Sequence, residues 1–386
     1  MKKVAIIPLR AGSKGIPDKN KKKIMGRPLF SWSLGEAIKS KLDEVYVFTD
    51  DDGIIDYVQK EYQWTPKVKV LKRSAESASD TASTEDAMLE FSSRIKESYD
   101  VLVLIQATSP LVRAEDIDKT IAQVEGGKDS ALTVVHTKRF IWNDKGESLN
   151  YDYMSRPRRQ DFDGGLRIEN GAVYATTKNQ FLSSKNRLGG DVAVVEMPEE
   201  SLYEIDEIED WLVIEKLLAN RLQKQKGALG QLKLLVLDVD GVFTDCKITN
   251  NAAGEFSKTF SMKDGMGLEI LRQNGVQVAV MTSEISDVVK SRMDKLQIKE
   301  LYMGVKDKYS RIDELLKEKE MSRSEIVYIG DDVNDLANIA SVGLGACPAD
   351  AVAEVKACAD LILSTNGGNG AIRELVGFIM KQNKRF

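Results

Sequence analysis

Two pairs of aspartates in the second half of this 386-residue chain have the spacing of a metal-assisted phosphoryl-transfer site. Asp238 and Asp240 stand directly after an apolar run, and Asp331 and Asp335 follow another apolar run further on. Carboxylates this close repel one another, and a bound cation such as Mg²⁺ removes the repulsion. The pattern predicts a Mg²⁺-dependent phosphatase, because acids that recur after a second strand are poorly explained as an acidic loop.

The segment 8–20, Pro-Leu-Arg-Ala-Gly-Ser-Lys-Gly-Ile-Pro-Asp-Lys-Asn, is a second candidate site. Its backbone N–H groups, Ser13 and the cations Arg10, Lys14 and Lys19 suit a polyphosphate. The glycine spacing fits neither a Walker loop nor the GxGxxG dinucleotide fingerprint. We therefore expect a loop that holds a nucleoside triphosphate, with a solvated basic turn as the alternative.

Strands and helices alternate along the first half at a spacing typical of a parallel sheet wrapped by helices. We expect strands at 4–8, 44–49, 67–71, 101–106, 131–135 and 171–175. We expect helices at 28–39, 54–62, 83–95, 114–125 and 208–226. The segment 144–166, with its glycines and charges, is expected to be an inserted arm.

The alternation restarts after the polar, glycine-containing stretch 224–230, which predicts two α/β domains, 1–226 and 231–386. In the second domain we expect strands at 233–237, 276–281 and 326–329 and helices at 265–273, 285–296 and 333–340. The aspartates then stand at strand ends, where open α/β sheets bind ligands.

The composition narrows the function further. A chain that is 42% hydrophobic and 30% charged is typical of a globular protein, and its net charge of -5 argues against nucleic-acid binding. No apolar stretch approaches membrane-spanning length. The cysteines Cys246, Cys347 and Cys358 form no CxxC pair, which favours a reducing cytoplasm. Because His136 is the only histidine, catalysis must rest on carboxylates, lysine, arginine and metal.

Several separated segments of the first half together resemble one enzyme family. They are 10–20, Thr49-Asp50-Asp51, 73–83, 106–111, 169–172 and Glu204-Ile205-Asp206. On these segments, residues 3–218 resemble the N-acylneuraminate cytidylyltransferases, or CMP-sialic acid synthetases. The resemblance implies a nucleotidyltransferase-type mixed sheet wrapped by helices, with CTP and a nonulosonic acid as substrates.

The resemblance also implies roles for individual residues. CTP binding would fall to Arg10, Ser13, Lys14, Asn20, Arg73 and Ser83. The sugar side would be lined by Gln106, Thr108, Ser109, Gln160 and Asn170. Asp206 would hold Mg²⁺ with Glu204, which stands where the family commonly has a second aspartate. Arg10 and Lys14 would neutralise phosphate charge as the sugar hydroxyl attacks the α-phosphorus. The proton acceptor stays open between a metal-bound water and a carboxylate.

The second half, residues 233–378, resembles the haloacid dehalogenase phosphatases and, more narrowly, their capless sugar-acid phosphatases. The resemblance rests on 238–245, 254–255, 263–265 and 330–335. It implies a Rossmann-like sheet in which Asp238 is the nucleophile and Asp240 the general acid and base. Thr282 would bind the phosphoryl group, and Lys308, favoured over Lys306, would neutralise charge. Mg²⁺ would be held by the carboxylates of Asp238, Asp331 and Asp335 and by a backbone carbonyl of Asp240.

One departure bears on the substrate. Octulosonate 8-phosphate phosphatases usually carry Thr-Gly-Arg where this chain has Thr282-Ser283-Glu284, and Glu284 resembles the nonulosonate 9-phosphate phosphatases. The capless family implies a homotetramer in which a hairpin at about 247–260 covers a neighbour's site, beside dimers of the transferase domains. The glycine-rich segment 367–370 would reach an active site or be disordered.

Together the two halves predict a bifunctional cytoplasmic enzyme. It would dephosphorylate a nonulosonate 9-phosphate, of the N-acetylneuraminate or deaminated type, and then transfer CMP from CTP to the free sugar acid. One alternative keeps the transferase and makes the second domain a non-catalytic tetramerisation module. The other is the equivalent octulosonate pathway. Neither a membrane nor a nucleic acid is expected as a partner.

Overall fold

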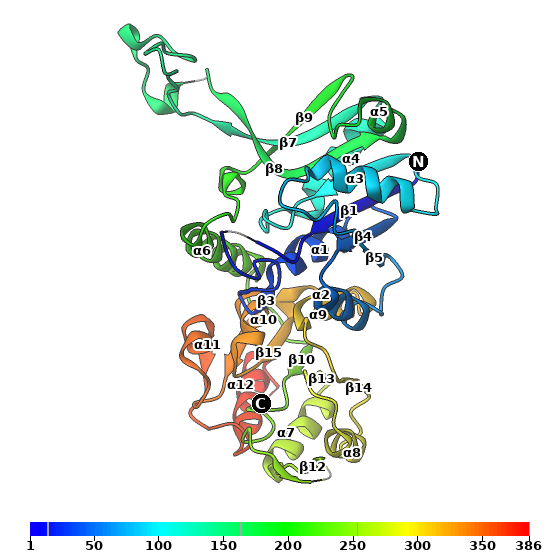
Figure 1. The fold of residues 1–386 in the computed structure, drawn as a ribbon. Coiled ribbons are helices and arrows are strands. Elements are labelled where there is room, and N and C mark those ends of the chain that lie inside the picture. The colour runs from blue at the N-terminus through cyan, green and yellow to red at the C-terminus, as the bar shows by residue number, and fades with distance from the viewer. Residues whose placement is uncertain (14, 163, 253, 386) are drawn as a thin grey trace. The chain divides into compact units, whose positions relative to one another are not determined.

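The computed structural model describes residues 1–13, 15–162, 164–252 and 254–385 as a chain of two compact units (Figure 1). The first unit comprises Met1–Ile24 and Pro28–Leu217, and the second comprises Met25–Arg27 and Leu218–Phe386. Among the described residues, no helix combines the length and apolar character needed to span a bilayer.

The first unit is built on a mixed sheet of seven strands. Their order is β5 (Val68–Lys72), β4 (Glu44–Thr49), β1 (Lys3–Leu9), β6 (Val101–Ile105), β8 (Leu166–Thr177), β7 (Ser130–Thr137) and β9 (Val192–Met197). β1 runs parallel to β4 and β6, whereas β8 runs antiparallel to β6 and β7. β1 and β6 are almost continuously apolar because both of their faces are buried.

Helices cover both faces of this sheet. They are α1 (Leu29–Lys39), α2 (Asp52–Glu61), α3 (Thr84–Arg94), α4 (Ala114–Glu125) and α5 (Lys178–Ser184). Alternate residues of a strand face opposite sides, so Ile7 packs in a cluster with Phe30 while Ile6 packs in another with Phe91. The side chain of Asp51 caps α2 by accepting from the first turn of that helix.

An arm leaves the sheet between β7 and β8 and projects away from it (Figure 1). It contains two short 3-10 turns, η1 (Tyr153–Ser155) and η2 (Arg159–Asp161), and a third, η3 (Glu199–Leu202), follows β9. Aromatic contacts hold the arm together, with the rings of Phe140 and Tyr151 4.4 Å apart between centroids. The predicted insertion at 144–166 is confirmed, although part of its C-terminal end is already β8.

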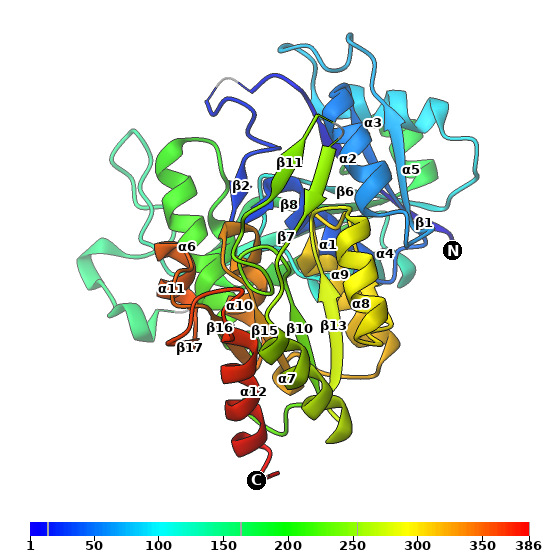
Figure 2. The ribbon, with the colours of Figure 1, turned by 90° about the horizontal axis from the view of Figure 1, so that it is seen from below.

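The second unit has a sheet of six strands in which every pair is parallel. Their order is β14 (Glu300–Tyr302), β13 (Gln277–Met281), β10 (Leu234–Leu237), β15 (Ile326–Ile329), β16 (Leu344–Cys347) and β17 (Leu361–Ile362). All of these except β14 are labelled in Figure 2. The helices are α7 (Met262–Gln273), α8 (Asp287–Lys295), α9 (Lys308–Glu318), α10 (Leu336–Ser341), α11 (Ala353–Cys358) and α12 (Ala371–Gln382). The 3-10 turns η4 (Arg323–Glu325) and η5 (Val333–Asp335) flank β15, and β11 (Thr249–Asn251) and β12 (Gly254–Ser257) form a separate hairpin.

The division between the units falls inside α6 (Ile208–Gln225), whereas the sequence places the linker after this helix. The end of α6 makes contacts within the second unit. The Tyr309 hydroxyl donates to Gln225 Oε1 at 3.0 Å, and the Lys226 ammonium lies 2.6 Å from Asp360. Two small strands, β2 (Lys23–Ile24) and β3 (Arg27–Pro28), flank a tight turn. The residues Met25–Arg27 of this segment belong to the second unit.

Candidate active sites

Two adjacent parallel strands bring the predicted aspartates to one edge of the second sheet. Leu237 of β10 pairs with Ile329 of β15, so the residues that follow both strands leave the sheet side by side. Asp238 therefore emerges next to the segment that carries Asp331. Strand β13 pairs with β10 on the side opposite β15, and Thr282 directly follows β13. Thr282 is buried and donates its backbone N–H to the carbonyl oxygen of Tyr302.

The ammonium of Lys308 links two of these aspartates. This lysine opens α9, its side chain is 0% exposed, and its Nζ lies 2.6 Å from Asp238 Oδ2 and 2.8 Å from Asp335 Oδ1. A buried ammonium is tolerated only with such partners. Burial favours the neutral amine, but the carboxylates of Asp238 and Asp335 outweigh it and raise the pKa of Lys308.

Asp335 is held from every side. The Tyr328 hydroxyl donates to its Oδ1 at 2.6 Å, and the backbone N–H of Asp331 donates to its Oδ2 at 3.1 Å. With Lys308, these donors fix the carboxylate in one orientation. Asp335 therefore positions both the lysine and the loop that carries Asp331.

The residues of this site fit a divalent cation. Oxygen atoms of Asp238, Asp331 and Asp335 all lie within 4.8 Å of one another. Burial, with the neighbouring carboxylates, raises the pKa of Asp238 to about 7 and that of Asp331 to about 8. This excess of negative charge is what an oxygen-ligated Mg²⁺ would neutralise. Gly241 lets the loop pass, because a Cβ at this position, where φ is +83°, would lie 1.9 Å from Asp331 Oδ2.

Asp240 lies on the same loop but in a different charge environment. Its carboxylate accepts from the Thr244 hydroxyl at 3.2 Å and from the buried ammonium of Lys258 at 2.7 and 2.8 Å. Glu284 is exposed beyond β13.

The glycine-rich segment 367–370 is ordered against the loop that follows β10 in its own chain. The Gly368 N–H donates to Val242 O at 3.0 Å, and a Cβ on Gly367 would lie 1.9 Å from Gly241 O. Of the two expectations for this segment, disorder is wrong. Glycine is required here because the two backbones touch.

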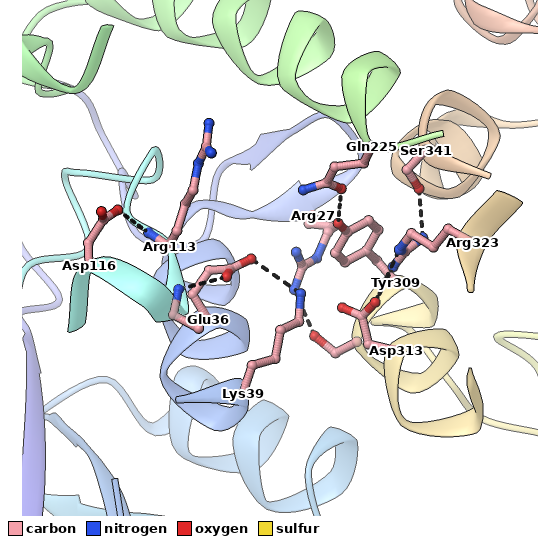
Figure 3. A network of polar contacts seen from close by, with 12 residues as sticks. Arg27, Glu36, Lys39, Arg113, Asp116, Gln225, Tyr309, Asp313, Arg323 and Ser341 are labelled. Atoms are coloured by element: carbon pink, nitrogen blue, oxygen red, sulfur yellow. Dashed lines mark hydrogen bonds and ion pairs between the residues drawn. The ribbon is translucent and has the colours of Figure 1, made fainter. Parts of the chain in front are cut away.

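A buried arginine supports the start of α9. Arg27 donates to both oxygens of Asp307, the residue before Lys308, at 2.8 and 2.9 Å. Figure 3 shows the ring of Tyr309 between the guanidinium groups of Arg27 and Arg323, which lie 4.6 and 4.0 Å from its centroid. All of these residues belong to the second unit. This packing fixes the helix turn from which Lys308 projects.

The first unit contains a cavity of about 320 Å³ at the ends of its parallel strands. It is lined by Pro8, Arg10, Ser13, Lys19, Asn20, Arg73, Ser79, Asp80, Ala82, Ser83, Thr84, Gln106, Ala107 and Thr108. The structure thus brings together most of the residues expected to bind CTP, although Arg10, Ser13 and Asn20 lie far along the chain from Arg73 and Ser83. Lys14 lies outside the described residues.

Hydrogen bonds shape the N-terminal loop around this cavity. Asn20 donates its side-chain amide to Arg10 O at 3.2 Å, which closes the loop on itself. The Arg10 guanidinium lies 3.0 Å from the carboxylate of Asp80. Lys19 donates to Ile205 O at 2.8 Å and so ties the loop to the segment that carries Asp206.

The residues expected on the sugar side fall into two groups. The hydroxyls of Thr108 and Ser109 are buried and have no hydrogen-bond partner among the described residues, which suits contact with a ligand. Asn170 is 1% exposed and donates to Ser201 O at 3.2 Å, while its oxygen accepts from Thr133 at 2.8 Å. Its side chain is engaged in the fold and does not line the cavity. Gln160 lies exposed on the arm.

Glu204 and Asp206 stand close to the N-terminal loop. Burial, with the nearby Asp206 carboxylate, raises the pKa of Glu204 to about 7. Gly171 makes room for Glu204, because a Cβ there would lie 2.3 Å from its Oε1. Within the described ranges, the only group of three or more acids close enough for one metal is that of the second unit. A metal in the first unit therefore stays a prediction.

Sequence reasoning missed several residues that the fold brings to these sites. Asp80 lies within a segment that it considered, but nothing in the pattern pairs it with Arg10. Tyr328, inside an apolar strand, looks like an ordinary core residue. Lys258 had no local signal, since 18 positions separate it from Asp240.

Comparison with known proteins places both halves in families. Residues 4–233 match the family Cytidylyltransferase, and residues 257–375 match the family haloacid dehalogenase-like hydrolase. The chain is 33% identical over 393 residues to the N-acylneuraminate cytidylyltransferase of Oncorhynchus mykiss, which covers 99% of this chain and 89% of that protein. It is also 31% identical over 391 residues to N-acylneuraminate cytidylyltransferase A of Danio rerio, and that match covers 99% of this chain and 89% of that protein.

The second half also matches a separate enzyme. It is 37% identical over 153 residues to the 3-deoxy-D-manno-octulosonate 8-phosphate phosphatase of Haemophilus influenzae, which covers 40% of this chain and 85% of that protein. The chain therefore belongs to the N-acylneuraminate cytidylyltransferase family, and it joins a nucleotidyltransferase domain to a phosphomonoesterase domain of the haloacid dehalogenase type.

Proposed function

We propose that this chain removes phosphate from a nonulosonate 9-phosphate and then transfers CMP from CTP to the free sugar acid. The observation that carries the proposal is the ion-pair group of Asp238, Lys308 and Asp335 beside Asp331. A domain that served only for assembly would have no need of a buried charge cluster at a strand edge. The product of one half is then the substrate of the other.

In the phosphatase half, Asp238 attacks the phosphorus and the sugar oxygen leaves. Lys308 holds the nucleophile in place through its 2.6 Å contact and offsets the charge of the incoming phosphate. Asp240 gives a proton to the leaving oxygen and later takes one from the attacking water. Thr282 binds the phosphoryl group. Mg²⁺ on Asp238, Asp331 and the carbonyl of Asp240, with Asp335 behind them, would neutralise phosphoryl charge when bound.

In the transferase half, the cavity residues align the α-phosphorus of CTP with the sugar hydroxyl. Arg10, Lys14 and Arg73 would neutralise the phosphates, and Ser13, Asn20 and Ser83 would orient the nucleotide. The sugar acid would contact Gln106, Thr108, Ser109 and Gln160, while Asn170, also expected on the sugar side, would support the fold through its bonds to Thr133 and Ser201. Of these, the unpaired hydroxyls of Thr108 and Ser109 give the strongest support. Asp206 and Glu204 are the proposed Mg²⁺ ligands in this half.

The substrate class rests on two arguments. The relatives that match the full length of the chain are named for N-acylneuraminate, which favours a nonulosonate. Glu284 puts a negative charge where octulosonate phosphatases usually carry arginine. The relatives of the second half alone are named for an octulosonate 8-phosphate, so the octulosonate pathway is the alternative.

The assembly and location are part of the same proposal. We expect a homotetramer through the phosphatase domains, with dimers of the transferase domains. The spacing of Cys246, Cys347 and Cys358, which form no CxxC pair, supports a reducing cytoplasm.

The first experiment supplies N-acetylneuraminate 9-phosphate or its deaminated analogue, in parallel with 3-deoxy-D-manno-octulosonate 8-phosphate, together with CTP and Mg²⁺. It follows phosphate, pyrophosphate and CMP-sugar. Phosphate release that precedes CMP-sugar from a nonulosonate supports the proposal. Formation of CMP-sugar from the unphosphorylated acid alone would assign the second domain to assembly. A preference for the octulosonate 8-phosphate would assign the enzyme to the octulosonate pathway.

A further inference from the structure

The base of the β11–β12 hairpin places a lysine against the expected general acid. Lys258 directly follows β12, and its side chain is 0% exposed. Its Nζ lies 2.7 Å from Oδ1 and 2.8 Å from Oδ2 of Asp240, while the Thr244 hydroxyl donates to Oδ1 at 3.2 Å. The carboxylate is therefore held by donors from two separate segments.

This ion pair is distinct from the acid group at the strand ends. Asp240 stands two positions after Asp238 but is not one of the acids gathered within 4.8 Å of one another. A lysine buried to this extent gives up its hydration, and an apolar residue would serve the hairpin at lower cost. The ion pair with Asp240 compensates for this lost hydration.

We propose that Lys258 is a positioning residue of the phosphatase, which holds the Asp240 side chain apart from the metal-binding acids and directed for proton transfer. The inference rests on the proposed phosphatase function. When Asp238 attacks, the bond between phosphorus and the sugar oxygen breaks, and its electron pair stays on that oxygen. The proton of the Asp240 carboxyl moves to this oxygen. Lys258 then pairs with the Asp240 carboxylate that remains. In the second step, a water molecule attacks the phosphorus bonded to Asp238, and the Asp240 carboxylate takes a proton from this water.

The test compares leaving groups. A sugar alkoxide needs a proton to leave, whereas 4-nitrophenolate leaves without one. For Lys258→Met we expect kcat on N-acetylneuraminate 9-phosphate to fall about 30-fold, with KM changed less than about twofold. This is less than the roughly 100-fold or more that general acid catalysis supplies, because Asp240 itself remains. The kcat on 4-nitrophenyl phosphate should fall less than about threefold. Lys258→Arg should recover part of the loss, and Lys258→Met should add little in an Asp240→Asn background.

Controls separate this role from simple folding. Lys317→Met, an exposed lysine on α9, should match wild type, and urea unfolding of each variant reports its stability. An equal loss on both substrates, or a rise in KM alone for the sugar phosphate, would overturn the positioning role while the phosphatase function stands. Wild-type protein that hydrolyses neither substrate would reject the phosphatase function and this inference together.

Discussion

The ammonium of Lys308 lies 2.6 Å from the carboxylate of Asp238, with no exposure of the lysine side chain. The contact joins the end of a central strand to the first residue of a helix 70 positions later, so the fold alone creates it. It orients the proposed nucleophile and compensates its charge before any substrate binds. The electrostatics of the phosphatase site depend on this pair.

Asp238→Asn should abolish phosphate release, because an amide cannot form the acyl phosphate. Transfer of CMP to the free sugar acid should remain within about twofold of wild type, since the described residues that line the cavity of the first unit all belong to that unit. Phosphate and CMP-sugar are measured in parallel, and Asp294→Asn, an exposed aspartate on α8, is the matched control. Loss of both activities in a folded variant would contradict independent sites.

Arg10→Ala should produce the opposite result. Removing the guanidinium takes one cation from the CTP phosphates, which should lower kcat/KM for CTP at least about 30-fold, as charge-assisted contacts to phosphate are worth roughly 2 kcal/mol or more. Phosphate release from the sugar phosphate should not change. Initial rates at varied CTP give the constant, and an unaltered kcat/KM would remove Arg10 from the site.

Lys308→Met should destabilise the second unit as well as inactivate the phosphatase. The substitution leaves Asp238 and Asp335 buried without their counter-ion, which costs about 3 kcal/mol or more in free energy of unfolding. Urea unfolding without metal measures this, and Lys317→Met serves as the control. Protonation at lower pH neutralises the two buried carboxylates. The loss in free energy of unfolding should therefore be larger at about pH 8.5 than at about pH 6. A loss independent of pH would contradict this account.

Mg²⁺ should stabilise the protein most at alkaline pH. The folded-state pKa values of Asp238 and Asp331, about 7 and about 8, lie above those of the unfolded chain. The stability that they contribute is therefore present at low pH and is lost as the pH rises through these values. Metal at about 100 times its Kd restores about 2.7 kcal/mol, and its affinity grows as the ligands lose protons.

Thermal unfolding with EDTA or Mg²⁺, at about pH 6 and about pH 8.5, measures this dependence. The shift in Tm should be larger at the higher pH and should shrink in Asp331→Asn. An equal shift at both values would mean that the metal stabilises the protein elsewhere.

Arg27→Met should weaken the start of α9. The bidentate bonds to Asp307 are lost and a buried carboxylate remains, at a cost of about 3 kcal/mol. Arg27→Lys should recover only part, because an ammonium cannot form the paired bonds of a guanidinium. Unfolding by urea and phosphate release are the readouts, with Lys23→Met, an exposed lysine on β2, as the control. Full stability in Arg27→Met would show that Asp307 needs no partner.

Much of the fold follows from local pattern. The apolar runs at 44–49 and 326–329 and the amphipathic run at 114–125 coincide with β4, β15 and α4, because continuous burial and helical periodicity are properties of short segments. The acids after β10 and β15 could be predicted to meet, since parallel neighbours present their carboxyl ends at one edge. The packing of the end of α6 within the second unit could not be predicted, because it depends on contacts with residues distant in the sequence, such as that of Gln225 with Tyr309.

The sequence by itself therefore determined the two chemistries, through carboxylates that require a cation and a cationic loop that suits a triphosphate. Only the tertiary structure decided which charges pair: Lys308 with Asp238 and Asp335, Lys258 with Asp240, Arg27 with Asp307. The last of these joins residues 280 positions apart. Local propensity carries no information on such pairs, because they form only where buried charges from distant elements must compensate one another.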